Sequence, residues 1–125
     1  MIENALNAKL KACSGVTSLV GPRIYVLELP QDLTYPAITY FKMPSQRHND
    51  IDIAMANIQI DGWTETYEEG QNLAENIRIA IQREKGVWSG VKVISVVLEN
   101  EYIDRDPDIR IYHSINEYRI KYREI

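Results

Sequence analysis

The stretch from residue 54 to residue 81, AMANIQIDGWTETYEEGQNLAENIRIAI, contains a strand that leads directly into a helix. From Ala54 to Thr64, apolar or small residues alternate with polar ones, which is the two-residue period of a half-buried strand. From Tyr67 to Ile81, apolar residues recur every three or four positions, as on one side of an amphipathic helix. The stretch therefore predicts a sheet with a helix packed on one face.

Sequence signals also mark the two ends of this helix. Thr66 is a residue type that caps helix N-termini, and Glu69 three positions later completes a capping box. Gly86 predicts the C-terminal stop, with Lys85 in the last turn, where the helix dipole favours a positive charge.

Working outward, the chain contains one further helical pattern and four further strand patterns. The helix is predicted over residues 2–13, and the strands over residues 23–29, 37–43, 91–103 and 109–123. Short loops favour antiparallel neighbours. We therefore expect one domain over residues 1–125 of the α+β class. Its single antiparallel sheet would have four to five strands and two main helices on one face, in the order α-β-β-β-α-β-β.

The last predicted strand changes its pattern halfway along. Its apolar residues are odd-numbered up to Ile115 and even-numbered from Tyr118 onward. Because side chains alternate between faces with a period of two, a regular strand cannot place both sets on one face. Either a β-bulge lies near Asn116, or the two halves are buried against different neighbours, and the bulge is the simpler interpretation.

The composition limits the classes to which the protein can belong. The chain has 125 residues and a net charge of −4, with 14 basic residues dispersed among 18 acidic ones. A nucleic-acid-binding protein concentrates its basic residues, so nucleic acid is not the expected primary ligand. The single cysteine, Cys13, lies on the apolar stripe of the first helix and is predicted to be a core thiol. No signal segment or long apolar run is present, so we expect a soluble protein in a reducing compartment.

Residue patterns typical of catalysis or metal binding are scarce. The sequence has no glycine-rich phosphate loop, nucleophile elbow or paired-cysteine zinc pattern. His48, Asp50 and Asp52 alternate within a long polar loop, where such residues are more often solvated than bound to a metal. His113 lies among apolar residues of the last strand, which indicates a core or interface histidine. We therefore expect no catalytic residue, no metal and no cofactor.

Several short motifs stand in a fixed order along the chain. They are Gly21-Pro22-Arg23-Ile24-Tyr25, Leu29-Pro30-Gln31, Tyr35-Pro36-Ala37-Ile38-Thr39-Tyr40, Ile58-Gln59-Ile60-Asp61-Gly62-Trp63, and Tyr67-Glu68-Glu69 followed by Leu73-Ala74. In this order and spacing, and with the late His113, they resemble the tail-completion (tail terminator) proteins of long-tailed bacteriophages and prophages. The resemblance extends from the first helix to about Tyr122.

The resemblance implies a structural role and no enzymatic activity. Proteins of that family cap the finished tail tube as a six-membered ring, stop its polymerisation and provide the surface that docks to the head connector. The implied partners are further copies of the chain, the major tail tube protein and the head–tail connector protein. DNA would pass through the ring without specific binding, and no membrane is involved. The implied location is the virion tail, after synthesis in the bacterial cytoplasm.

Two groups of residues are expected to make these contacts. The long polar loop is predicted to bind partners through Gln46, Arg47, His48, Asn49, Asp50, Ile51 and Asp52. Apolar and aromatic side chains beyond what one sheet face needs are typical of an interface. The expected ring-interface residues of this kind are Tyr40, Trp63, Ile79, Tyr118 and Tyr122.

Two alternatives remain open at this point. The chain could be another neck or head-completion component, because small folds of this kind recur in such machines. A different class is a small carboxylate-dependent or metal-dependent enzyme, or a ligand-binding module, using His48, Asp50 and Asp52. Carboxylate pairs leave no linear signature, so the sequence alone leaves this class open.

Overall fold

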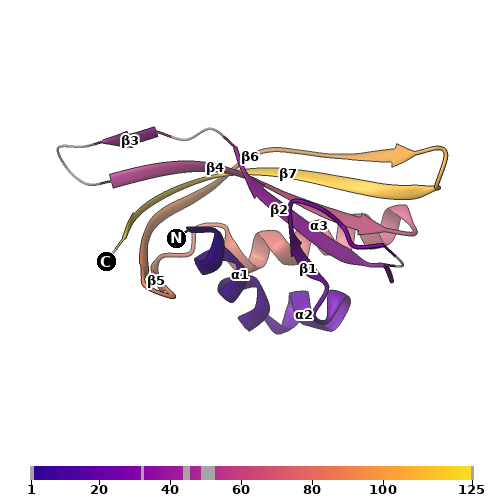
Figure 1. Cartoon of the computed structure of the whole chain (residues 1–125), viewed down its shortest axis with the longest axis horizontal. Coiled ribbons are helices and arrows are strands. Elements are labelled where there is room, and N and C mark those ends of the chain that lie inside the picture. The colour runs from indigo at the N-terminus through magenta and orange to yellow at the C-terminus, as the bar shows by residue number, and fades with distance from the viewer. Residues whose placement is uncertain (1, 32, 44–45, 49–52, 125) are drawn as a thin grey trace.

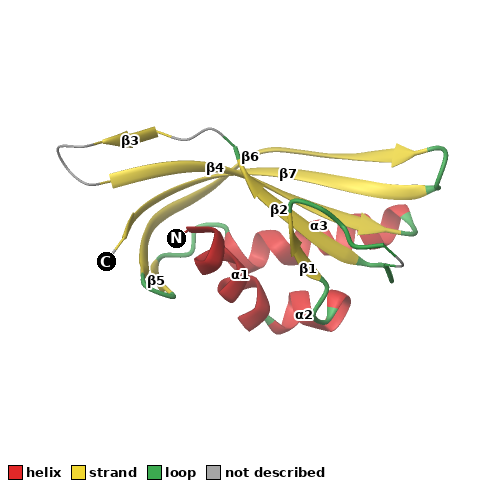
Figure 2. Ribbon diagram, viewed as in Figure 1, coloured by secondary structure: helices red, strands yellow, loops and turns green. Residues whose placement is uncertain are grey.

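The computed structural model describes residues 2–31, 33–43, 46–48 and 53–124. Within these residues the chain forms three helices and seven strands. In chain order they are α1 (Ile2–Ala12), α2 (Ser14–Val20), β1 (Ile24–Val26), β2 (Ala37–Lys42), β3 (Gln46–His48), β4 (Ile53–Thr64), α3 (Tyr67–Ile81), β5 (Gly86–Trp88), β6 (Val91–Asp106) and β7 (Ile111–Glu124). Figure 2 shows all the helices on one side of a single curled sheet.

The described sheet is mixed. Six strands follow the order β1-β2-β4-β7-β6-β5, and β3 pairs with β4 off this path. β1 runs parallel to β2, whereas the other pairs are antiparallel. The predicted fold is therefore wrong: the sheet is not a purely antiparallel one of four to five strands, and the order is not α-β-β-β-α-β-β.

Short elements explain most of the difference between prediction and structure. α2 has seven residues, and β1, β3 and β5 have three each, which is too short for a periodic pattern to stand out. Cys13 has an extended backbone (φ −91°, ψ 115°), which separates α1 from α2. Short connections favour antiparallel neighbours. β1 ends at Val26 and β2 begins only at Ala37, and a connection of this length allows the two strands to run parallel.

The core lies between the helices and the concave face of the sheet. Figure 1 shows the sheet curling over α1, α2 and α3. Both layers contribute side chains that are at most 1% exposed, including Leu6, Leu10, Leu73, Ile77, Ile58, Ile60, Tyr118 and Ile120. Burial of each such side chain contributes about 1.5–3 kcal/mol, so this face stabilises the fold. None of the helices in the described ranges is long and apolar enough to cross a membrane.

Thr66 caps α3 as predicted, whereas the predicted capping box forms only in part and the helix ends elsewhere than predicted. Thr66 is the N-cap, and its Oγ1 accepts a hydrogen bond from the backbone N–H of Glu69 at 3.2 Å while donating to Glu69 Oε1 at 3.0 Å. The helix ends at Ile81, where Gln82 takes an extended backbone and Arg83 a left-handed one (φ 62°). Gly86, predicted as the stop signal, instead begins β5.

The bulge predicted near Asn116 is absent from β7, and two other irregularities lie in the neighbouring strand β6. β7 pairs with β4 in one unbroken register past Asn116, whereas the pairing of β6 with β7 shifts at Ile94 and again at Glu99. The even-numbered face of β7 enters the core, with Tyr118 and Ile120 no more than 1% exposed. The prediction of a bulge at Asn116 is therefore wrong. The apolar residues change from odd to even numbers because the strand is buried on different faces along its length.

The predicted polar loop is partly a strand. Gln46–His48 form β3, which pairs with residues 53–55 of β4. Strands pair through backbone hydrogen bonds, so a strand can form without alternating apolar residues. The prediction missed β3 because it relied on that alternation. Asn49, Asp50, Ile51 and Asp52 lie outside the described residues, and the partner-binding role of residues 46–52 stays a prediction.

Candidate functional site

Side chains alternate along β4, so the residues of its Ile58–Trp63 motif are divided between the two faces of the sheet. Ile60 is fully buried in the core, and Gly62 lies against α3. Because neighbouring side chains point to opposite faces, Gln59, Asp61 and Trp63 lie on the face away from the helices.

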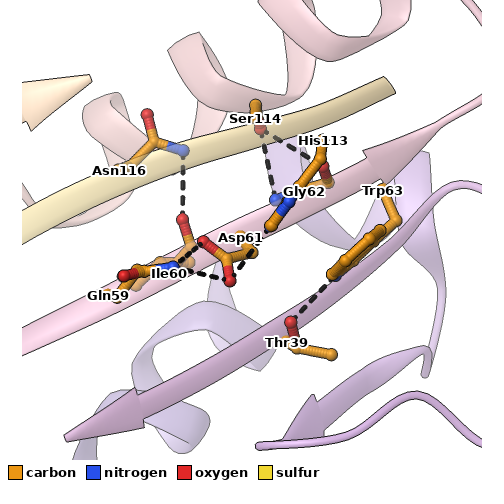
Figure 3. Close-up of polar contacts among 9 residues, drawn as sticks. All are labelled: Thr39, Gln59, Ile60, Asp61, Gly62, Trp63, His113, Ser114 and Asn116. Carbon is orange, nitrogen blue, oxygen red and sulfur yellow. Dashed lines mark hydrogen bonds and ion pairs between the residues drawn. The ribbon is translucent and has the colours of Figure 1, made fainter. Parts of the chain in front are cut away.

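Neighbouring strands complete a polar cluster on this face, as Figure 3 shows. β2 places Thr39 opposite Asp61, and β7 places His113 opposite Trp63. We call Thr39, Gln59, Asp61, Trp63 and His113 the outer-face network. Four of its residues fall within motifs that carried the family resemblance, and the fifth is the late histidine.

Asp61 is the charged centre of the outer-face network and is only 4% exposed. Gln59 Nε2 donates hydrogen bonds to its two carboxylate oxygens at 2.9 and 3.0 Å. His113 Nε2 lies 3.2 Å from Asp61 Oδ2, a position in which a protonated imidazole forms an ion pair. A buried carboxylate is costly without partners, so these contacts explain how the sheet keeps an acid beneath its surface.

Trp63 connects the remaining members of the network. Its indole ring stacks on the imidazole of His113, with 3.8 Å between ring centroids and 12° between planes. Its Nε1 donates a hydrogen bond to Thr39 Oγ1 at 2.8 Å. Because the contacts join β2, β4 and β7, the outer-face network links three adjacent strands through side chains.

The geometry does not assemble a catalytic triad around His113 and Asp61. Ser114 follows His113 in β7, so the serine faces the helices while the histidine faces away from them. Ser114 Oγ is engaged with the backbone of Gly62, accepting from its N–H at 3.2 Å. Among the described residues, no three His, Cys, Asp or Glu side chains are grouped so that they could hold a metal ion. Of the sequence candidates, His48 lies in β3, while Asp50 and Asp52 lie outside the described residues.

The helix-facing side of this region is closely packed. Asn116 Nδ2 donates to the backbone oxygen of Ile60 at 3.1 Å. A Cβ at Gly62 would lie 2.6 Å from Ser114 Oγ and 2.9 Å from Leu73 Cδ2. The glycine of the Ile-Asp-Gly-Trp motif is therefore required by the close approach of α3 to β4.

A groove lies between α3 and the far part of the β6–β7 hairpin. Its volume is about 590 Å³, and Ser114 and Asn116 are among the residues that line it. Three carboxylates also line it, those of Glu68, Glu75 and Glu101. This negative lining is unsuited to a phosphate or another anion.

Three of the five predicted ring-interface residues are used inside the single chain. Tyr40, Tyr118 and Tyr122 are at most 2% exposed. Tyr40 Oη accepts a hydrogen bond from Asn7 Nδ2 at 3.0 Å. Burial raises the pKa of the Tyr118 phenol, and the nearby carboxylate of Glu101 raises it further.

The other two predicted interface residues differ in their surroundings. Ile79 lies on α3 and is 61% exposed, whereas Trp63 is partly buried within the outer-face network. An interface role for these two stays a prediction.

Sequence reasoning did not select the apolar side chains that are most exposed on the β6–β7 hairpin. Tyr102 of β6 is 51% exposed, and Ile109 in the turn is 57% exposed. In the edge strand β1, the last residue Val26 is also exposed, as is Leu27 after it. In the sequence, Ile109 directly follows a run of charged residues, which could have marked it as exposed. The prediction instead made it the first residue of the last strand.

The fold and its surfaces define a class of small proteins in which a curled mixed sheet covers three helices and carries a side-chain network on its outer face. One protein family, described as "Tail completion protein gp17", matches residues 4–123. The chain belongs to this family of tail completion proteins, which are structural proteins of bacteriophage tails.

A solved structure shows the same fold. A chain from the "Virion of native gene transfer agent (GTA) particle" superposes with a TM-score of 0.79 and 16% sequence identity, and the match covers 97% of this chain and 93% of that chain. At this identity the likeness shows the fold alone. Among curated proteins no match was found.

Proposed function

We propose that the protein caps the finished phage tail tube as a ring of identical copies, ends tube polymerisation and provides the head-joining surface. The observation that carries the proposal is the match of a tail completion family to residues 4–123, which spans the helices, the sheet and the outer-face network. A ring also needs subunit surfaces beyond the core, and the exposed side chains of Ile79, Tyr102 and Ile109 supply apolar groups for such contacts.

The proposed ring has three kinds of protein neighbour. They are further copies of the chain, six in total as the family resemblance implies; the major tail tube protein; and the head–tail connector protein. The virion tail is the proposed location, reached after synthesis in the host cytoplasm. The net charge of −4 supports a lumen through which DNA passes without specific binding, because acidic side chains repel phosphates.

Electron microscopy of tail tubes tests the proposal directly. Tubes would be assembled from the tail tube protein of the same genome, with and without the purified chain. We expect a ring at one end of each tube and an end to tube growth when the chain is present. Tubes that keep growing with uncapped ends at saturating protein concentration would contradict the proposal.

A further inference from the structure

The hairpin of β6 and β7, here called the β6–β7 ribbon, carries opposite charge at its two ends. Residues 100–117, which pair with one another at its turn end, contain five acidic and two basic residues, a net charge of −3. Residues 83–94 and 121–124, its β5 end, contain five basic and two acidic residues, a net charge of +3. Between the two ends, Arg119 Nε and Glu99 Oε1 form an ion pair at 2.8 Å. The two ends lie at opposite sides of the molecule in Figure 1. The chain therefore has a strong charge separation that its net charge of −4 conceals.

The turn end presents an exposed apolar side chain beside carboxylates. Ile109 is 57% exposed and follows Asp106 and Asp108 within the turn. The turn is held by hydrogen bonds from Asp108 N to Asp106 Oδ1 at 2.9 Å and from Arg110 N to Asp106 O at 2.8 Å. One of its two basic residues, Arg105, lies over the ring of Tyr112 at 5.9 Å. The turn end is thus an ordered apolar projection with an acidic border.

The β5 end presents the complementary surface. A cavity of about 370 Å³ has an apolar lining that includes Ile53, Val93 and Ile94. Three cations, Lys85, Lys92 and Arg123, border the same cavity. In the described part of the chain, no ion pair engages any of these three cations. The cavity has room for one aliphatic side chain and an excess of positive charge around it.

We propose that the turn end of one copy docks on the β5 end of the next, with Ile109 in the cavity and Asp106 and Asp108 facing Lys92 and Arg123. The contact rests on the proposed ring function and names the surface through which the copies join. Since the two surfaces lie at opposite ends of one ribbon, they cannot meet within a single chain. The contact is heterologous, and repetition of such a contact produces a closed ring when the rotation between copies closes.

A second copy is the occupant that the surfaces favour. Both halves of the contact belong to this chain; each has an apolar centre, and their border charges are opposite in sign. Charge complementarity of this kind steers encounter and sets the register of an interface. The contact would weaken with added salt, because the border charges remain close to solvent.

Paired charge reversals test this contact. The first variant carries Asp106→Lys and Asp108→Lys, the second carries Lys92→Asp and Arg123→Asp, and the third combines all four changes. A matched control carries Glu28→Lys and Glu65→Lys, two exposed acids outside both ends. Each variant would first be shown to have the melting temperature of the unchanged chain. Self-association is measured by sedimentation at low and high salt, and capping is measured on tail tubes.

We expect each two-site reversal to weaken self-association and capping by about tenfold or more, because like charges then face each other at every subunit boundary. The four-site variant should recover both properties, and the control should retain them. Unchanged assembly in both reversal variants would overturn the contact while leaving the capping function in place. If the unchanged chain self-associates but does not cap tubes, the proposed capping function is wrong. Sedimentation of the reversal variants then still tests whether the copies join through this contact. If the unchanged chain forms no assembly in solution or on tail tubes, the contact is overturned as well.

Discussion

The two ends of the β6–β7 ribbon share one secondary structure but differ in burial and charge. At the β5 end, the side chains of Val91, Val93 and Tyr122 are at most 2% exposed and belong to the core. At the turn end, Tyr102 and Ile109 are more than half exposed, and a groove separates α3 from the ribbon. The comparison teaches that contact with the helices, and not strand length, determines how far the core extends along the sheet.

The largest expected difference is between two isoleucines given the same substitution. Ile60→Ala removes a fully buried side chain and should lower the free energy of unfolding by about 2–5 kcal/mol. Ile109→Ala, in the exposed turn, should change it by about 0.5 kcal/mol or less. Urea unfolding of both variants makes the comparison. Equal losses would show that the turn end is part of the core.

A smaller difference is expected between two glycines at the contact between α3 and the sheet, Gly62 in β4 and Gly70 in α3. Gly62→Ala places a Cβ within 2.9 Å of Leu73 Cδ2 and should cost about 1–3 kcal/mol through overpacking. For Gly70→Ala the nearest atom is Thr64 Oγ1 at 3.2 Å, and alanine favours the helix by up to about 1 kcal/mol, so little net change is expected. Thermal unfolding distinguishes the two. A harmless Gly62→Ala would contradict the close approach of α3 to β4.

Two buried tyrosines should differ by about 1 kcal/mol in the loss of stability when each is replaced by phenylalanine. Tyr118 Oη has no hydrogen-bond partner among the described residues, so Tyr118→Phe should leave stability unchanged or raise it slightly at neutral pH. Tyr40→Phe loses the hydrogen bond from Asn7 and should cost about 0.5–1.5 kcal/mol. Chemical denaturation measures both. A larger loss at Tyr118 than at Tyr40 would reverse the expected order.

The raised pKa of Tyr118 also predicts how stability depends on pH. The unfolded phenol ionises near pH 10, whereas burial holds the folded phenol neutral to higher pH. The stability linked to this group is therefore complete below about pH 10 and is lost as pH rises above it. Tyr118→Phe should therefore make the decline in stability above about pH 10 shallower. An identical decline in both proteins would contradict this assignment.

The smallest effect on stability is expected from removal of residues 46–52. β3 pairs with residues 53–55 of β4 off the main strand path, and Gln46, Arg47 and His48 are polar residues. We expect the shortened chain to remain folded, with a melting temperature close to that of the full chain, but to be defective in tube capping. Circular dichroism and the capping assay test the two halves separately. A chain that no longer folds would show that β3 supports the core.

The longest elements of the fold could be predicted from sequence because they combine a clear period with a local signal. The alternation from Ala54 to Thr64 and the N-cap residue Thr66 define β4 and the start of α3. α2 and β5 are too short to show a period, and the β6 bulges at Ile94 and Glu99 depend on pairing with a partner strand. Such features are set by tertiary contacts and leave little trace in the local sequence.

The surfaces were harder to predict than the strands. Tyr118 and Tyr122 fitted the composition of an interface, but a tyrosine that fills the core has the same pattern of neighbours in the sequence. Asp61 and His113 are far apart in the chain, and only the register of β4 with β7 brings them together. The opposite charges of the ribbon ends likewise appear only when β6 and β7 are paired.

The most direct test of the account is crosslinking between the two ends of the β6–β7 ribbon. A chain with Cys13→Ser, Ile109→Cys and Ile94→Cys would be assembled on tail tubes and treated with a short thiol-specific crosslinker. The account predicts a ladder of species beyond the dimer that ends at the ring size, whereas either single-cysteine chain gives no ladder. Capped tubes on which the two-cysteine chain gives no crosslink between copies would contradict the account.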